Sequence, residues 1–362
     1  MRTTGEPPQW ALVWFLLAGL GAGLAIGLPF TGARPIVLLP ALTAAMVALT
    51  GSAGPPRLVV PLATWAASST AIVVCLGFLV SGRPWPAGAA MALVAVFTSA
   101  AAGAGPLGAV LGMMNTLAYV LSMVIATSIS ARGSATLLDV VLWATAAAVA
   151  GFAVAAGGSV LRHRSMPGAG RDGPAPPAPW RAIWSSLRGM DEHARDGVRR
   201  AVPLTGCVVW YVASDSHDAL WVLIAALAVL LPTGKSTWEM SLGRVSATLL
   251  GVVVVAVLGE LLPLGALLAL AVLAFLFGQA YKPVVPLLGG AASSFAAVVF
   301  VGAPTANLGS TGAHRLVDTL IGVAIALAAS YLLWPRDRAE ETDGDTDDGT
   351  VDDGASPVDG VR

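Results

Sequence analysis

The chain has 362 residues, of which 56% are hydrophobic and only 11% are charged. Soluble domains carry about 25% charged residues, so this composition, with a mean hydropathy of +0.78, excludes a soluble fold. The net charge of −1 hides a segregation, because arginines concentrate between residues 162 and 200 and acidic residues between 337 and 359. Cys75 and Cys207 lie in apolar stretches, where we expect small core residues and no disulfide framework or metal site.

Twelve apolar segments are long enough, or nearly so, to cross a bilayer as helices, which takes roughly 17–25 residues. These segments are 10–30, 35–50, 58–80, 86–104, 106–130, 136–161, 200–214, 218–232, 245–262, 263–278, 283–302 and 315–334. The sequence therefore predicts an all-α integral membrane protein with about 12 transmembrane helices. One alternative stays open, in which 200–214 and 218–232 form a re-entrant pair and ten full spans remain.

Basic residues favour one orientation of these helices. If both termini are cytoplasmic, the cytoplasmic side carries the eight arginines between 162 and 200, whereas the outer loops carry only Arg34, Arg83, Arg132 and Arg315. An excess of basic residues inside is the general rule, so we expect a multi-pass protein of the cell membrane with cytoplasmic N- and C-termini. The first apolar run has no clean small-residue cleavage site after it, which favours a retained helix over a signal peptide.

Two stretches outside the apolar segments divide the chain. Residues 162–199 form a predicted cytoplasmic linker, and apolar residues between Trp180 and Val198 recur at helical spacing with arginines opposite. Such a pattern is typical of a helix in the membrane interface, although a helix packed on a partner chain would also show it. Residues 337–362 are acidic and poor in apolar side chains, so we expect a disordered tail. The two membrane parts are then 1–161 and 200–336.

The two membrane parts resemble each other at a shift of about 177–179 residues. The matching landmarks are Pro86–Leu93 over Pro263–Leu270, Pro106 over Pro283, and Leu137–Asp139 over Leu316–Asp318. Agreement of several landmarks in order predicts two six-helix repeats. Because each repeat has an even number of helices, the two copies are predicted to be parallel, with a substrate site at the interface between them.

No catalytic pattern stands out in the sequence. The segment Thr233–Thr237 resembles the end of a Walker A loop, but position 229 is Val where that motif needs its first Gly. The four histidines are scattered, and neither HExxH nor GxSxG occurs at a membrane edge. We therefore expect no enzymatic activity, no cofactor, no metal and no nucleic-acid partner. The expected partners are the lipid bilayer and a small substrate, and the oligomeric state is not indicated.

Ionisable side chains inside a span cost about 2.5–3.5 kcal/mol even on a lenient insertion scale, so each needs a reason. The candidates are Asp139, Glu260, Asp318, Arg244 and Arg315. Arg315 and Asp318 are three residues apart and share one helical face, so they form either a structural pair or a substrate or proton site. Asp139 has Thr136 at the corresponding position instead of an arginine, which makes it the better candidate for a proton carrier.

Two motifs resemble a known family. Leu231-Pro232, followed by Arg244-Val-Ser-Ala247-Thr248-Leu-Leu-Gly251, resembles the P…RxxGTxxG signature of the fusaric-acid-resistance (FUSC) or aromatic acid exporter family, with Ala247 in place of the first Gly. The last helix, from Arg315 to Arg336, is similar to the closing helix of that family. Many members carry a large cytoplasmic domain between the halves, whereas this chain has fewer than forty residues there.

The resemblance implies a resistance-type efflux protein of the cell inner membrane that exports small aromatic or other organic acids, driven by the proton gradient. We predict that Arg244, Thr248 and Arg315 bind this organic anion and that Asp139 and Asp318 couple its movement to protons. A plain positive-inside anchor would explain Arg244 equally well. The alternatives are a passive organic-anion channel of the same fold and a membrane scaffold that docks partners on the linker.

Interrupted helices indicate where the substrate passes. Segments broken by Pro or Gly at matching positions of two repeats point to a transporter's site. Two pairs qualify here, 35–50 with 218–232 and 106–130 with 283–302. Their freed backbone groups are tolerated at membrane depth only where they line a cavity shielded from lipid.

Overall fold

The computed structural model describes residues 7–31, 38–53, 56–130, 136–165, 179–214, 217–230, 237–302 and 308–332. Within these ranges all regular structure is helical, which confirms the predicted all-α class. The first-half helices are α1 (Trp10–Thr31), α2 (Leu38–Ala48), α3 (Pro56–Val80), α4 (Pro84–Ala100), α5 (Pro106–Ser130) and α6 (Leu137–Ser165). The later helices are α7 (Pro179–Gly189), α8 (Glu192–Ser214), α9 (His217–Val229), α10 (Thr237–Leu261), α11 (Leu264–Tyr281), α12 (Pro286–Gly302) and α13 (Leu308–Leu332). Short 3-10 turns, η2 (Leu49–Ala53) and η3 (Ala101–Ala104), extend α2 and α4.

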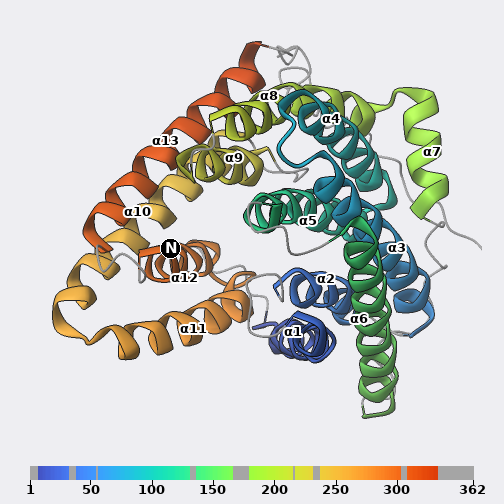
Figure 1. Ribbon diagram of the computed structural model, residues 1–362, viewed down its shortest axis with the longest axis horizontal. Helices are drawn as coiled ribbons and strands as arrows, with labels where there is room; N and C mark the ends of the chain where they lie inside the picture. The colour runs from blue at the N-terminus through green and yellow to red at the C-terminus, as the bar shows by residue number, and fades with distance from the viewer. Residues whose placement is uncertain are drawn as a thin grey trace, which may run out of the picture.

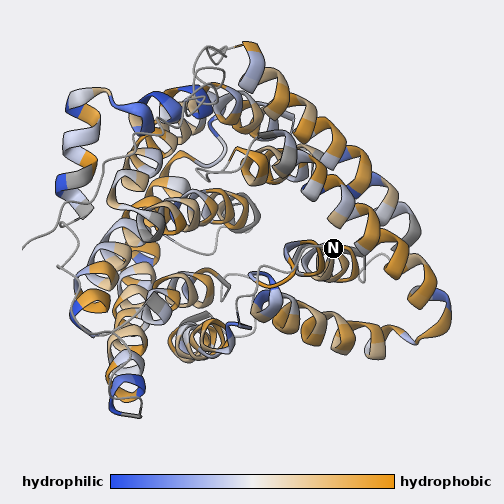
Figure 2. Ribbon diagram, turned by 180° about the vertical axis from the view of Figure 1, so that it is seen from behind, coloured by the Kyte–Doolittle hydropathy of each residue, from blue (hydrophilic) through white to orange (hydrophobic). Residues whose placement is uncertain are grey.

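Among the described residues, eight helices are long and apolar enough to cross a membrane, namely α1, α3, α4, α5, α6, α10, α11 and α13. Shorter apolar helices lie at Leu39–Ser52, Ala219–Val229 and Pro286–Phe300. Large apolar side chains such as Trp14, Ile72 and Leu332 point outward, and hydrophobic colour dominates the outer faces of the helices in Figure 2. An exposed apolar surface of this extent requires lipid around it. The chain is a multi-pass helical membrane protein.

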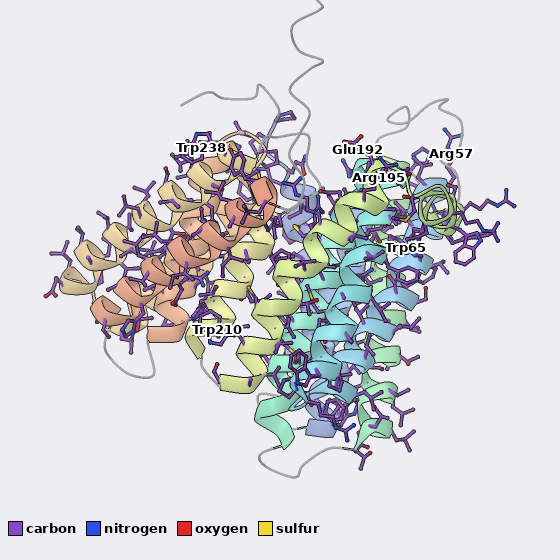
Figure 3. All side chains as sticks on the ribbon, turned by 90° about the horizontal axis from the view of Figure 1, so that it is seen from above. Arg57, Trp65, Glu192, Arg195, Trp210 and Trp238 are labelled. Atoms are coloured by element: carbon purple, nitrogen blue, oxygen red, sulfur yellow. The ribbon has the colours of Figure 1, made fainter. Side chains whose placement is uncertain are left out.

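The linker region differs from the single helix expected between Trp180 and Val198. The structure divides it into α7 and α8, because Met190 adopts a φ of 45° and ends the first helix. Asp191 then caps the second helix, with its Oδ1 accepting a hydrogen bond of 3.0 Å from the Ala194 N–H. As a result α8 joins the polar end of the expected linker helix to the apolar segment 200–214. In Figure 3, α7 is seen end-on beside helices that run up the page, so it lies across their direction.

The two halves of the molecule pack by the same scheme. In the first half α3 packs on α5 and α6, and α2 packs on α1 and α6. In the second half α10 packs on α12 and α13, and α9 packs on α8 and α13. Figure 1 shows these two groups side by side, with α4 and α8 adjacent at their junction.

Helices α4 and α8 form the main junction between the halves. A Cβ atom at Gly88 would lie 2.6 Å from Val209 Cγ2, so any larger residue there would force the Val209 side chain to move. Thr205 Oγ1 donates a hydrogen bond of 3.2 Å to the Gly88 carbonyl oxygen across the same contact. A second and smaller junction joins α1 to α11, where the Trp10 ring meets Phe277 edge-on at 5.1 Å.

Candidate functional site

The last helix carries two buried charges inside the apolar part of the protein. Arg315 and Asp318 are each only 5% exposed, and their opposite charges interact. Burial follows from the position of α13 between α9 and α10. Gly322 brings α13 against the backbone of α9, since a Cβ there would lie 2.5 Å from the Val222 carbonyl oxygen. The two charges expected to share one helical face are thus both in the interior, within electrostatic range of each other.

The Arg315 guanidinium is held by an aromatic ring from α9. Its Cζ lies 3.7 Å from the ring centroid of Trp221, a cation–π contact that fixes the guanidinium plane. Arg315 Nε and Nη1 are buried and find no hydrogen-bond partner among the described residues. Buried donors are normally paired, so these two N–H groups single out Arg315 as a candidate binding residue.

Helix α10 brings Arg244 and Thr248 into the same region on one of its faces. Thr248 is fully buried, and Gly251 one turn later lets α10 approach α12, where a Cβ would lie 2.8 Å from Ser294 Cβ. Arg244 Nε, Thr248 Oγ1 and Ser294 Oγ are all buried without a hydrogen-bond partner among the described residues. Sequence reasoning singled out Arg244 and Thr248 and missed Ser294, whose hydroxyl has no motif to mark it.

Positive charge exceeds negative charge in this cluster. Arg244 is within electrostatic range of both Arg315 and Lys282. Desolvation of the Lys282 ammonium group, and then the charge of Arg244, lower the pKa of that lysine, even though the residue as a whole is exposed at the turn after α11. In the part of this cluster that the structure describes, Arg244, Lys282 and Arg315 stand against the carboxylate of Asp318. Buried cations without full compensation are costly, and a bound anion would remove that cost.

Asp139 lies elsewhere and has a local role. Its carboxylate accepts hydrogen bonds of 2.8 Å from both the N–H and the hydroxyl of Thr136, while its own N–H donates to Thr136 Oγ1 at 3.3 Å. These bonds form a capping box at the start of α6. Helix α6 packs on α1, α2 and α3, so the structure does not bring Asp139 together with Arg315 and Asp318. Glu260 is exposed near the end of α10.

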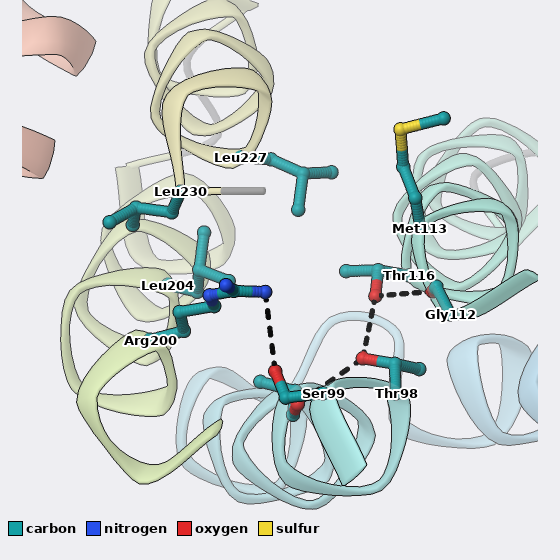
Figure 4. A pocket seen from close by; sticks show the side chains of 10 residues that line it. Thr98, Ser99, Gly112, Met113, Thr116, Arg200, Leu204, Leu227 and Leu230 are labelled. Atoms are coloured by element: carbon teal, nitrogen blue, oxygen red, sulfur yellow. Dashed lines mark hydrogen bonds between the residues drawn. The ribbon is translucent and has the colours of Figure 1, made fainter. Parts of the chain in front are cut away.

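A second polar cluster lies at the junction of the halves, around Arg200 on α8 (Figure 4). Arg200 is 8% exposed, forms an ion pair with Asp196, and its Nη1 donates to Ser99 Oγ at 3.4 Å. It borders a cavity of about 20 Å³, which has room for one water molecule. Thr116 already donates its hydroxyl proton to the Gly112 carbonyl oxygen, so it offers the cavity an acceptor. An Arg donor facing a hydroxyl acceptor suits a bridging water better than an anion.

The fold and the cluster define a helical membrane protein with cationic side chains gathered between α9, α10 and α13. Residues 204–329 match the family described as fusaric acid resistance protein-like. This stretch runs from α8 to α13 and contains Arg244, Thr248, Ser294, Arg315 and Asp318, so the match supports the FUSC resemblance on the residues that build the site. No curated protein and no solved structure matches the chain.

Proposed function

We propose that this protein is a secondary transporter that exports small aromatic or other organic acids across the cell membrane, with substrate bound by Arg244, Thr248 and Arg315. The observation that carries the proposal is the set of buried donors on α10 and α13 that lack partners among the described residues. A carboxylate takes bidentate hydrogen bonds from arginine, and the Trp221 ring beside Arg315 offers an apolar face to the rest of the ligand. The match to the fusaric acid resistance family points to the same class of substrate.

Two parallel six-helix repeats form the framework of this proposal. The packing supports this framework, because helices at the same place in the two halves make the same contacts. For example, α3 packs on α6 in the first half, and α10 packs on α13 in the second. The junctions are reciprocal as well, because the fourth helix of each half meets the first helix of the other, α4 with α8 and α11 with α1. A twofold axis along the membrane normal relates parallel repeats in this way.

Under this proposal, α6 and α13 are equivalent helices, and their contacts align them differently from the sequence landmarks. Gly151 and Gly322 both lie 14 residues after the start of their helices, and both meet the second helix of their own repeat, at Ala44 and Val222 respectively. The two glycines are thus equivalent, and the difference of 171 residues between them pairs Asp139 with Ser310. On this alignment the landmark that laid Leu137–Asp139 over Leu316–Asp318 is eight residues, about two helical turns, out of register, because apolar helices match by chance in more than one register.

Proton coupling is assigned to Asp318 ahead of Asp139. Asp318 is buried beside Arg315, so its protonation would change the charge that a bound anion experiences. The capping box gives the Asp139 carboxylate a structural task. We retain the cytoplasmic termini, and we propose no enzymatic activity and no cofactor.

Transport by the purified full-length protein in liposomes tests this function. Efflux of benzoate is measured with a pH gradient alone, with a membrane potential alone, and with neither. We expect benzoate flux to follow the pH gradient. Flux that follows the potential alone would identify a passive anion channel, and absence of flux of any aromatic carboxylate would contradict a transport function.

Arg244→Lys is the variant that tests the site. Lysine keeps the positive charge of an anchor but loses the planar two-pronged donor, so we expect a loss of roughly tenfold or more in benzoate flux, the equivalent of one charged hydrogen bond. Arg57→Lys at the start of α3, the equivalent helix of the first half, serves as the matched control and should keep full flux. If Arg244→Lys exports as well as the unmodified protein, Arg244 is an anchor and not a ligand.

A further inference from the structure

The short helix α7 has one buried face, while several of its large side chains are exposed. Ile183 and Ser186 are buried, and Ile183 packs with Ala100 and Ala101 at the end of α4. This face holds α7 on the membrane part of the protein. Gly189, the last residue of the helix, is exposed, and a Cβ there would meet no other described segment within 4 Å. Next to the buried face runs an exposed stripe of Trp180, Trp184 and Arg188 at i, i+4 and i+8, with Arg181 beside it.

Each tryptophan in this stripe supports an arginine. Arg181 Cζ lies 5.2 Å from the ring centroid of Trp180, and Arg188 Cζ lies 4.9 Å from that of Trp184. The rings remain 60% and 51% exposed, which is unusual for so large an apolar surface in water. Stacking occupies the flat face of a guanidinium and leaves its N–H edge open, and that edge matches the oxygens of a phosphate.

The orientation of α7 decides which partner fits. Figure 3 shows α7 end-on at the rim of the molecule near Arg57 and Trp65, across the direction of the spanning helices. A helix that lies parallel to the membrane plane, with tryptophan and arginine on one stripe, occupies the headgroup level of a bilayer. The rings then contact the upper acyl chains while the arginines reach phosphate oxygens.

We infer that the Trp180–Arg181–Trp184–Arg188 stripe of α7 is a binding site for the phosphate headgroups of anionic membrane lipids. Because the buried face of α7 rests on the end of α4, and α8 begins directly after it at the Asp191 cap, a lipid bound there holds the α4–α8 junction together. The site lies outside the matched segment 204–329. It does not depend on which substrate the protein carries.

A probe attached at two positions of α7 tests the placement. The full-length protein, with Cys75 and Cys207 replaced by serine, receives one cysteine at Trp184→Cys or Gly189→Cys, carries a fluorophore there, and is placed in phosphatidylcholine–phosphatidylglycerol nanodiscs. We expect lipids with a nitroxide near the headgroup to quench the probe at 184, and aqueous iodide to quench the probe at 189. Quenching of position 184 by iodide would overturn the inference. Shielding of position 184 from both quenchers would overturn it too, in favour of a docked second copy.

The double variant Arg181→Gln/Arg188→Gln tests the headgroup chemistry in otherwise native protein. We expect phosphatidylglycerol to raise the Tm of the detergent-solubilised protein by several degrees more than phosphatidylcholine does, and this difference to vanish in the double variant. Arg164→Gln, an exposed arginine at the end of α6, is the control and should keep the difference. Inorganic phosphate should not replace the lipid. An equal Tm rise in the double variant, or an equal rise with inorganic phosphate, would contradict a lipid site on this stripe.

Discussion

Polar side chains between the third and fifth helices of each half are arranged in opposite ways. In the first half, Thr70 Oγ1 donates to Asn115 Oδ1 at 2.9 Å, and Asn115 Nδ2 donates to Ser69 Oγ at 2.8 Å. The result is a closed network between α3 and α5. In the second half, Thr248 on α10 and Ser294 on α12 are equally buried, yet their hydroxyl oxygens have no partner among the described residues.

This difference separates a closed structural contact from one that is open to a ligand. A buried polar network that is fully satisfied stabilises a helix pair, whereas buried groups left open lower stability unless a ligand completes them. Under the proposed function, the second half gives up some stability where an anion would bind. Its arginines follow the same logic, since Arg315 and the Nε atom of the half-buried Arg244 are buried with donors that have no hydrogen-bond partner among the described residues.

The largest expected effect comes from removing a hydrogen-bonded polar group in the first half and an unpaired hydroxyl in the second. Asn115→Leu leaves the Thr70 and Ser69 hydroxyls without their partner and should lower the free energy of unfolding by about 1–3 kcal/mol, with unchanged affinity for benzoate. Thr248→Val removes an unpaired hydroxyl of the same shape, so stability should stay the same or rise, while the Kd for benzoate rises by roughly three- to tenfold. Thermal unfolding and equilibrium binding on the same preparations measure both. Destabilisation by Thr248→Val would mean that its hydroxyl is already satisfied.

The pH dependence of binding sharpens the comparison further. Because the folded protein lowers the pKa of Lys282, this lysine loses its charge at a lower pH than an ordinary lysine. Affinity for benzoate should therefore fall as the pH rises through that lowered pKa, and Lys282→Arg should keep the affinity constant over the same range, since arginine stays protonated. A Kd series against pH for both proteins tests this. The same fall in Lys282→Arg would assign the titration to another group.

The smallest effect is expected at Asp139. Asp139→Asn weakens the exposed capping box with Thr136 and should lower the Tm only slightly, with no change in the dependence of transport on the pH gradient. Asp318→Asn should uncouple benzoate flux from that gradient, because it removes the only carboxylate assigned to the site. Loss of coupling in Asp139→Asn and not in Asp318→Asn would reverse the assignment.

Much of this architecture follows from the sequence, because hydropathy marks each apolar helix directly. The all-α class agrees with the hydropathy pattern. The separation of 200–214 and 218–232 into two helices agrees with it as well. The break between α7 and α8 was not predicted, since it depends on Met190 in a left-handed conformation and on the Asp191 cap. Helical periodicity is continuous across that point and gives no sign of it.

The site could be predicted only in part, for a related reason. A charge in an apolar segment is conspicuous, so Arg315 and Asp318 are found by inspection. Trp221 and Ser294 belong to residue types that are ordinary in membrane helices, and only the packing of α9 and α12 brings them to the arginines. The role of Asp139 depended on a repeat register that apolar sequence cannot fix.

The most direct test of the account is whether benzoate stabilises the protein through Arg315. Tm is measured with and without saturating benzoate for the unmodified protein, for Arg315→Met, and for Asn115→Leu as the first-half control. We predict a rise in Tm for the unmodified protein and a similar rise from a lower starting Tm for Asn115→Leu, because a ligand stabilises the state that binds it. Arg315→Met should show no rise. A full rise in Arg315→Met would contradict an anion site built on the open donors of the second half.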